Sequence, residues 1–392
     1  GVVVALVLGT LLCSLETTDA RIQIETARNW TQGKGFVFFD SKSGTYHTNM
    51  LWPPSYMLFL GVLMKAGLSG AWAMRATWIL SATVFVASLG ALARLFWGER
   101  EKTRALGFTA FSVSLWTLGL GLDMYAAAWM LSALWLLSRE IMRRQFTTGS
   151  LALNCVVWLG AAVTRYNYFP LLAVPVLAYV YIALTQKQKY AWKRAGAYAV
   201  VLGILFATYQ AAIRMSLSGD WNYVAKNIRG FYPENLLHFS AYLLDGWGGG
   251  AMLLHRFRHV DALLVCAKIA SFLVTVWIVG RAFVDAIKNR TLPAFLTLCV
   301  WALVLLPLVY LSLTVKAQDW LPGGWTYVQS SRYLIVPITL SLVYLAPLFG
   351  RSVWGKGIYA AVLTVHFLQS VNLTVKIFVL QQWQITNLIY NP

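Results

Sequence analysis

Two aspartates lie beside long apolar segments, where an ionised side chain has a high free energy. Asp19 follows an apolar run, within Glu16-Thr-Thr-Asp-Ala-Arg21. Asp123 is the only ionised residue between Arg104 and Arg139. A carboxylate inside an apolar hairpin is a functional candidate, suited to act as a general base or to bind a cation. The alternative role for Asp123 is to cap the helix that follows it.

A second group of candidates is basic or aromatic, and most of its members lie near the ends of apolar segments. Guanidinium groups bind phosphate well, so these residues predict contacts to a phosphorylated substrate. Anchoring at the membrane interface is the alternative for the arginines and aromatic residues, and a lone loop histidine is more often an ordinary surface residue. The candidate substrate-binding residues are Arg21, His47, Trp52, Arg165, Tyr166, Lys268, Arg332 and Tyr333.

The composition indicates which elements must position these residues. The chain has 392 residues, of which 59% are hydrophobic and 12% are charged, whereas soluble domains carry roughly a quarter charged residues. This balance predicts an integral membrane protein with many spans. Its apolar runs are too long for the strands of a barrel, so the expected fold class is all-α.

Apolar windows predict about 11 transmembrane helices. These are expected near 1–13, 72–96, 104–122, 124–138, 150–164, 167–185, 195–213, 262–281, 293–315, 333–350 and 355–373. The apolar run 55–64 is too short to cross a bilayer. We therefore expect residues 54–65 to form a juxtamembrane helix rather than a span.

The basic residues predict the orientation. With this span count, five short loops share one side, and they hold 16 of the 32 lysines and arginines. The positive-inside rule makes that side the cytoplasm. The outer side then receives a first loop at 14–71, which contains the juxtamembrane helices, and a second large loop at 214–261. We expect residues 1–392 to form a single polytopic domain without a separate soluble domain.

The net charge of +18 is consistent with this arrangement and does not indicate a nucleic-acid partner. No basic run is longer than two residues, whereas nucleic-acid sites concentrate basic residues in patches. The expected partners of the surplus cations are membrane lipids.

The order of these features resembles the GT-C superfamily of polytopic glycosyltransferases, in particular the branch of protein O-mannosyltransferases and the lipid A aminoarabinose transferase. The resemblance rests on Asp19 after the first span, the stretch from Ala27 to Pro54, Asp123 after the third span, and Ser331-Arg332-Tyr333 before a late one. The family usually has a second acidic residue beside the first, but Ala20 stands there. A divalent cation, Mg²⁺ or Mn²⁺, shared by Asp19 and Asp123 is therefore an open alternative, and no other cofactor is expected.

The resemblance implies transfer of a sugar from a polyprenyl-phosphate donor to a hydroxyl on a lipid, glycan or protein acceptor. The reaction would take place on the outer face of the membrane, which we expect to be the periplasmic face of a bacterial inner membrane. Asp19 would be the general base, and Asp123 would orient the acceptor, hold Arg21 or share a cation with Asp19. Two other classes remain open: an O-antigen ligase or polymerase, and a lipid-linked sugar transporter or flippase. A non-catalytic accessory subunit is a further alternative.

Overall fold

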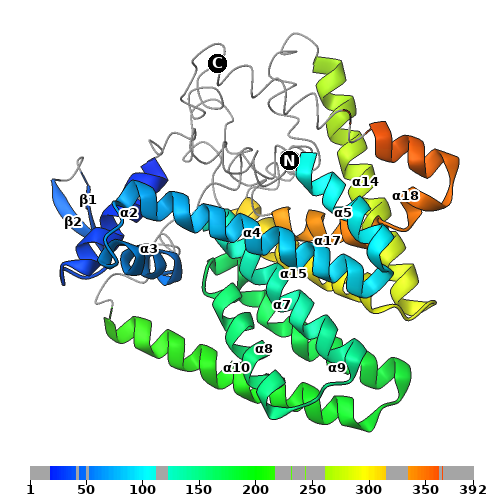
Figure 1. The fold of residues 1–392 in the computed structure, drawn as a ribbon, viewed down its shortest axis with the longest axis horizontal. Coiled ribbons are helices and arrows are strands. Elements are labelled where there is room, and N and C mark those ends of the chain that lie inside the picture. The colour runs from blue at the N-terminus through cyan, green and yellow to red at the C-terminus, as the bar shows by residue number, and fades with distance from the viewer. Residues whose placement is uncertain are drawn as a thin grey trace.

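The computed structural model shows a bundle of long helices with a small appendage at one end (Figure 1). It describes residues 18–40, 44–49, 53–111, 122–216, 231, 243, 261–314, 334–361 and 364. Five helices in this part are long and apolar enough to cross a membrane. The prediction of a multi-pass, helical membrane protein is therefore confirmed, while the count of about 11 spans stays a prediction.

The bundle consists of helices from most of the predicted windows. They are α4 (Gly70–Trp97), α5 (Glu99–Phe111), α7 (Leu122–Arg143), α8 (Thr148–Ala162), α9 (Ala173–Gln186), α10 (Lys189–Ser216), α14 (Asp261–Ile287), α15 (Leu292–Thr314), α17 (Ile335–Leu345) and α18 (Leu348–Arg351). The predicted span 1–13 lies outside the described residues, as do parts of 104–122 and 355–373.

Prolines change two of the predicted spans. The window 167–185 begins as the 3₁₀ helix η1 (Tyr166–Leu172), which contains Pro170, before α9 continues it. The window 333–350 is irregular between α17 and α18, where Pro347 precedes the second helix. A proline lacks the backbone N–H that a regular helix requires, but Ala346 and Pro347 both keep helical dihedral angles. The segment Ile335–Arg351 therefore remains one apolar helix with a local irregularity.

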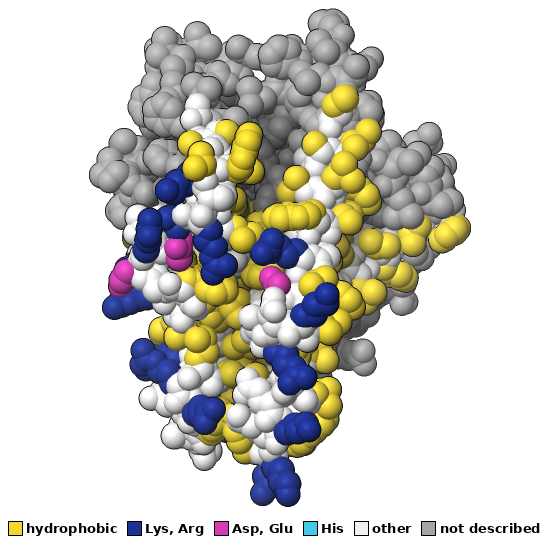
Figure 2. Space-filling view, turned by 90° about the vertical axis from the view of Figure 1, so that its right-hand side faces the viewer, with side chains coloured by type: hydrophobic (Ala, Val, Ile, Leu, Met, Phe, Trp, Pro, Cys, Tyr) yellow, Lys and Arg dark blue, Asp and Glu magenta, His cyan; other side chains and the backbone are white. Residues whose placement is uncertain are grey.

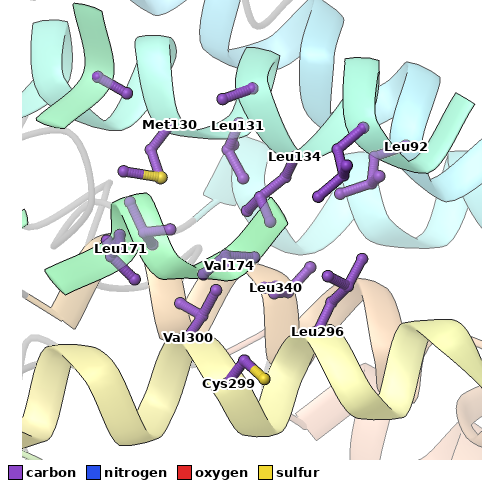
Figure 3. Packing of buried hydrophobic residues seen from close by; sticks show 14 of the residues in the cluster. Leu92, Met130, Leu131, Leu134, Leu171, Val174, Leu296, Cys299, Val300 and Leu340 are labelled. Atoms are coloured by element: carbon purple, nitrogen blue, oxygen red, sulfur yellow. The ribbon is translucent and has the colours of Figure 1, made fainter. Parts of the chain in front are cut away.

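Aliphatic side chains from α4, α7, η1, α9, α15 and α17 interdigitate in the centre of the bundle (Figure 3). Leu92, Leu131, Leu134, Val300 and Leu340 are all fully or almost fully buried there. Helix α7 lies in the middle of this packing, against α4 and α8. The first turn of α7 therefore belongs to a helix whose residues are mostly buried.

The appendage consists of α2 (Thr18–Thr31), a hairpin of β1 (Val37–Asp40) and β2 (Thr45–Thr48), and α3 (Ser55–Lys65). The helix at 55–65 confirms the predicted short helix. The hairpin was not predicted. It lies against α2, where the Phe39 N–H donates to Glu25 Oε1 (2.9 Å) and Asn29 Nδ2 donates to the Val37 carbonyl (2.8 Å). A short strand pair needs such a supporting surface to be stable.

All five short basic loops lie at the end of the bundle opposite to this appendage. Hydrogen bonds connect these loops and the adjoining helix ends. The donors and acceptors are Arg194 to the Thr147 carbonyl, Arg290 to the Thr185 carbonyl, the Trp97 indole to the Val343 carbonyl, the Tyr359 hydroxyl to the Arg104 carbonyl, and the Tyr344 hydroxyl to the Asp285 carboxylate. Figure 2 views the molecule from this side and shows many lysine and arginine side chains with few acidic ones. The structure thus supports the expectation that these loops share one side, which we call the basic end.

Candidate functional site

The opposite end of the bundle contains a buried ion pair between Asp123 and Arg165. The two side chains are only 2% and 5% exposed, respectively. Asp123 is the second residue of α7. It lies within the first turn of this helix, and its carboxylate faces a guanidinium from another segment.

Arg165 reaches this position because the chain turns between α8 and η1. Its backbone is extended (φ −147°, ψ 140°), its N–H donates to the Ala162 carbonyl (3.3 Å), and its own carbonyl accepts from the Tyr168 N–H (3.0 Å). This single extended residue between two helical segments places the Arg165 side chain in the interior. A buried charge requires a partner of opposite sign, and Asp123 is that partner.

Helix α2, which includes Asp19, reaches the same region through a small hydrophobic cluster. Ala20 of α2 belongs to one buried cluster with Leu122 and Tyr125 of α7. The residue after Asp19 and the residue before Asp123 are thus members of the same packing unit. The side chain of Asp19 itself lies outside the described part of the structure.

Helix α3 connects α2 to the ion pair. Ser55 Oγ, in the first turn of α3, donates to the Val163 carbonyl (2.8 Å), two residues before Arg165. Tyr56 packs edge-on against Tyr125 of α7, with ring centroids 5.4 Å apart. The region where α2, α3 and α7 begin and α8 ends is therefore one continuous structure, which we call the acidic end.

The other predicted site residues are distributed unevenly. Arg21 is exposed on α2, and Tyr166 is partly buried directly after Arg165. Burial raises the pKa of Tyr166 to about 12, so its hydroxyl stays protonated near neutral pH. His47 is exposed on β2, where its Nε2 lies 3.0 Å from Thr45 Oγ1. The hairpin projects from the margin of the molecule (Figure 1).

Four predicted residues cannot be placed relative to the ion pair. Lys268 belongs to α14, but its side chain is outside the described part. Trp52, Arg332 and Tyr333 fall outside the described residues altogether. Asp123 was expected to hold Arg21 as one of three alternatives, and the structure instead pairs it with Arg165.

A metal site would need further ligands besides Asp123. Within the described ranges, no group of three His, Cys, Asp or Glu residues is close enough to hold an ion. Arg165 is the partner of the Asp123 carboxylate in the described structure. The side chain of Asp19, the other predicted ligand, is outside the described part, so a cation shared by Asp19 and Asp123 stays a prediction.

The sequence reasoning missed a buried carboxylate near the basic end. Glu140 is 2% exposed and accepts hydrogen bonds from Tyr179, Arg194, Asn154 and Tyr198, at 2.5 to 3.0 Å. These donors come from α8, α9 and α10. The signal was obscured because Arg139-Glu140 follows an apolar run and therefore resembled the end of a span. The network joins four helices and has no described connection with the acidic end.

Comparisons with known proteins identify the fold. ArnT from Cupriavidus metallidurans, in a crystal structure with bound undecaprenyl phosphate, is 15% identical, with a TM-score of 0.56, over 99% of this chain and 73% of that chain. The Archaeoglobus fulgidus oligosaccharyltransferase, in a crystal structure with zinc and sulfate, is 14% identical, with a TM-score of 0.53, over 94% of this chain.

The chain spans about half of that oligosaccharyltransferase, 52% of its length. No protein-family model matches the sequence, and no curated protein sequence matches it. The similarity is therefore one of fold, and both matched structures belong to GT-C enzymes. The protein has the GT-C superfamily fold.

Proposed function

We propose that this protein is a membrane glycosyltransferase that transfers a sugar from a polyprenyl-phosphate donor to an acceptor hydroxyl at the acidic end. The observation that carries this proposal is the buried Asp123–Arg165 pair beside the helix that includes Asp19, within a GT-C fold. ArnT, which has the same fold, has been crystallised with a polyprenyl phosphate. A lipid-linked donor is therefore the class of substrate that best fits this chain.

In this reaction Asp19 acts as the general base. The acceptor oxygen attacks the anomeric carbon of the sugar while its proton passes to the Asp19 carboxylate. The bond between the anomeric carbon and the phosphate oxygen breaks, and its electron pair leaves with the phosphate. A single displacement opposite the leaving group inverts the anomeric configuration, whereas retention would need a covalent intermediate.

The leaving phosphate is a weak base, so it needs a positive electrostatic environment rather than a general acid. Arg165 is the described cation at the acidic end that is best placed for this role. Asp123 acts as a positioning residue, because its ion pair fixes the buried guanidinium. Lys268 and Arg332 are further candidate cations, and Arg21, Tyr166, His47, Trp52 and Tyr333 are candidate substrate contacts.

The orientation of the site follows from the opposite ends of the bundle. The basic end faces the cytoplasm by the positive-inside rule. The acidic end then opens to the outer face, which we place in the periplasm of a bacterium. The acceptor is a lipid, glycan or protein that presents a hydroxyl on that face. A divalent cation, Mg²⁺ or Mn²⁺, shared by Asp19 and Asp123 is the alternative to this scheme.

The test uses purified full-length protein with a polyprenyl-phosphate sugar, and it measures release of polyprenyl phosphate. Asp19→Asn should abolish release, because the amide cannot accept the proton. The control is Glu25→Gln on the same helix, where the amide oxygen still accepts the Phe39 N–H. Full activity of Asp19→Asn would refute the assignment of the base, and no release by the unmodified protein with any such donor would refute the function.

A further inference from the structure

A second ligand site is suggested by the ends of α9 and α14 at the basic end. Two hydrogen bonds hold these helix ends together: the Tyr181 hydroxyl donates to the Ala286 carbonyl (2.7 Å), and Arg290 Nη1 donates to the Thr185 carbonyl (3.1 Å). Lys187 follows Thr185 by two residues. The two helix ends thus form a fixed pair rather than two independent loops.

Three exposed cations surround this junction: Lys187, Lys288 and Arg290. No described carboxylate forms an ion pair with any of them. Asp285, the acidic residue of this loop, instead accepts from Tyr344 and Asn289 and lies 3.7 Å from Arg281 Nε. The junction therefore carries a local positive charge that the described protein does not neutralise.

Two of these cations have a left-handed backbone conformation. Lys187 and Arg290 have φ angles of +53° and +52°, in the left-handed region that disfavours a residue with a side chain. Glycine is the usual residue at such a helix end. A cation there interacts favourably with the helix dipole.

In the last turns of α9 and α14, before these cations, large apolar side chains are exposed. Leu184 of α9 is 65% exposed, and Phe283 and Ile287 of α14 are 52% and 59% exposed. Leu184 is three residues from Tyr181, and Phe283 is three residues from Ala286, which places them next to the bonded pair on the helix surfaces. A cationic rim above an apolar wall matches the two parts of an anionic lipid.

We propose that the ends of α9 and α14 form a binding site for an anionic phospholipid of the leaflet at the basic end. Lys187, Lys288 and Arg290 bind the headgroup phosphate, and Leu184, Phe283 and Ile287 contact an acyl chain. The proposal is independent of the glycosyltransferase function, because none of these residues belongs to the acidic end.

The experiment is native mass spectrometry of the full chain in detergent, titrated with phosphatidylglycerol or with phosphatidylcholine. Lys187→Gln/Lys288→Gln should weaken phosphatidylglycerol binding about tenfold, while Arg290 stays in place to hold the junction. The matched control is Arg143→Gln/Arg144→Gln, which removes the same charge at the end of α7, where Arg144 also has a positive φ (+53°). This control should bind nearly as well as the unmodified protein.

Further variants and ligands test the site separately from protein folding. Lys187→Arg/Lys288→Arg should retain binding, and Lys187→Gln alone replaces the double variant if that variant does not fold. Equal losses in the site variant and the α7 control would overturn the site. Binding of phosphatidylcholine as tight as that of phosphatidylglycerol would overturn the selectivity for an anionic headgroup. Displacement of phosphatidylglycerol by an equal concentration of inorganic phosphate would overturn the lipid and show an anion site instead.

Discussion

Removal of either member of the Asp123–Arg165 pair should destabilise the protein far more than removal of both. Both side chains are almost completely buried. A single substitution leaves one buried charge without its partner, which costs about 3–5 kcal/mol. Unit charges ~4 Å apart at an effective dielectric constant of about 20 attract by about 4 kcal/mol, a comparable value. We therefore expect this loss in Asp123→Leu and in Arg165→Met.

The double variant Asp123→Leu/Arg165→Met should recover most of this stability. Apolar replacement of a whole buried pair is often neutral or even stabilising, so the coupling energy of the cycle should be about 3 kcal/mol or more. The double variant should nonetheless release no polyprenyl phosphate, because the cation for the leaving group is missing. Recovered stability without recovered activity separates the structural role of the pair from its catalytic role.

Buried cysteines provide the assay for this cycle. Cys155 and Cys299 are buried and should react with a fluorogenic maleimide only after unfolding. Cys266 is exposed and Cys13 lies outside the described residues, so both should be changed to serine in every variant. With about 2–4 °C per kcal/mol in domains of 150–250 residues, a loss of about 3–5 kcal/mol should lower the melting temperature of the single variants by roughly 6–20 °C. Additive losses in the double variant would refute the reasoning, since they would show that the two charges do not depend on each other.

Two further predictions concern packing away from the ion pair. Glu140→Ala removes the acceptor of Arg194 and should lower stability by about 3–5 kcal/mol in the same assay; a melting temperature equal to that of the unmodified protein would contradict the network. Gly61→Ala would place a new Cβ 2.5 Å from Trp30 Cε3. The Trp30 ring or α2 itself must then move, and we expect the turnover number to fall. Gly203→Ala, which meets nothing within 4 Å, is the control, and equal turnover in both variants would contradict this expectation.

The sequence predicted the helices of the bundle well because their signal is local. Apolar runs of sufficient length identify spans without knowledge of their neighbours. The helix start after Gly98 (φ +92°) and the helix end before Gly33 (φ +77°) are likewise encoded by residues at the boundary itself. The short helix at 55–65 was predicted from its length and from the side on which the basic loops must lie.

The features that were missed depend on partners distant in the sequence. The hairpin β1–β2 is supported by Glu25 and Asn29 of α2, and no property of its own eight residues shows that support. The pairing of Asp123 with Arg165 joins residues 42 positions apart. Both had been identified as candidates, but only their packing shows that the two side chains face each other.

For Glu140, the local sequence pattern indicated an exposed residue, whereas the structure buries its carboxylate. A charged residue after an apolar run indicates the end of a span when the charge reaches water. Here helix α7 continues to Arg143, and the carboxylate turns inward to donors on three other helices. Sequence patterns report the average environment of a charged residue, whereas burial of a specific one depends on whether several distant donors converge on it.

The two aspartates of the proposed site belong to different helices. Asp123 and its partner Arg165 are fixed in the bundle by α7 and α8, whereas Asp19 belongs to α2, which contacts the bundle through α3, α4 and the small cluster around Ala20. A shift of α2 and α3 would therefore move the proposed base relative to a stationary cation. We expect substitutions at the contacts between α2 and α3 to change turnover while the bundle melts normally. Substitutions at the ion pair should change both.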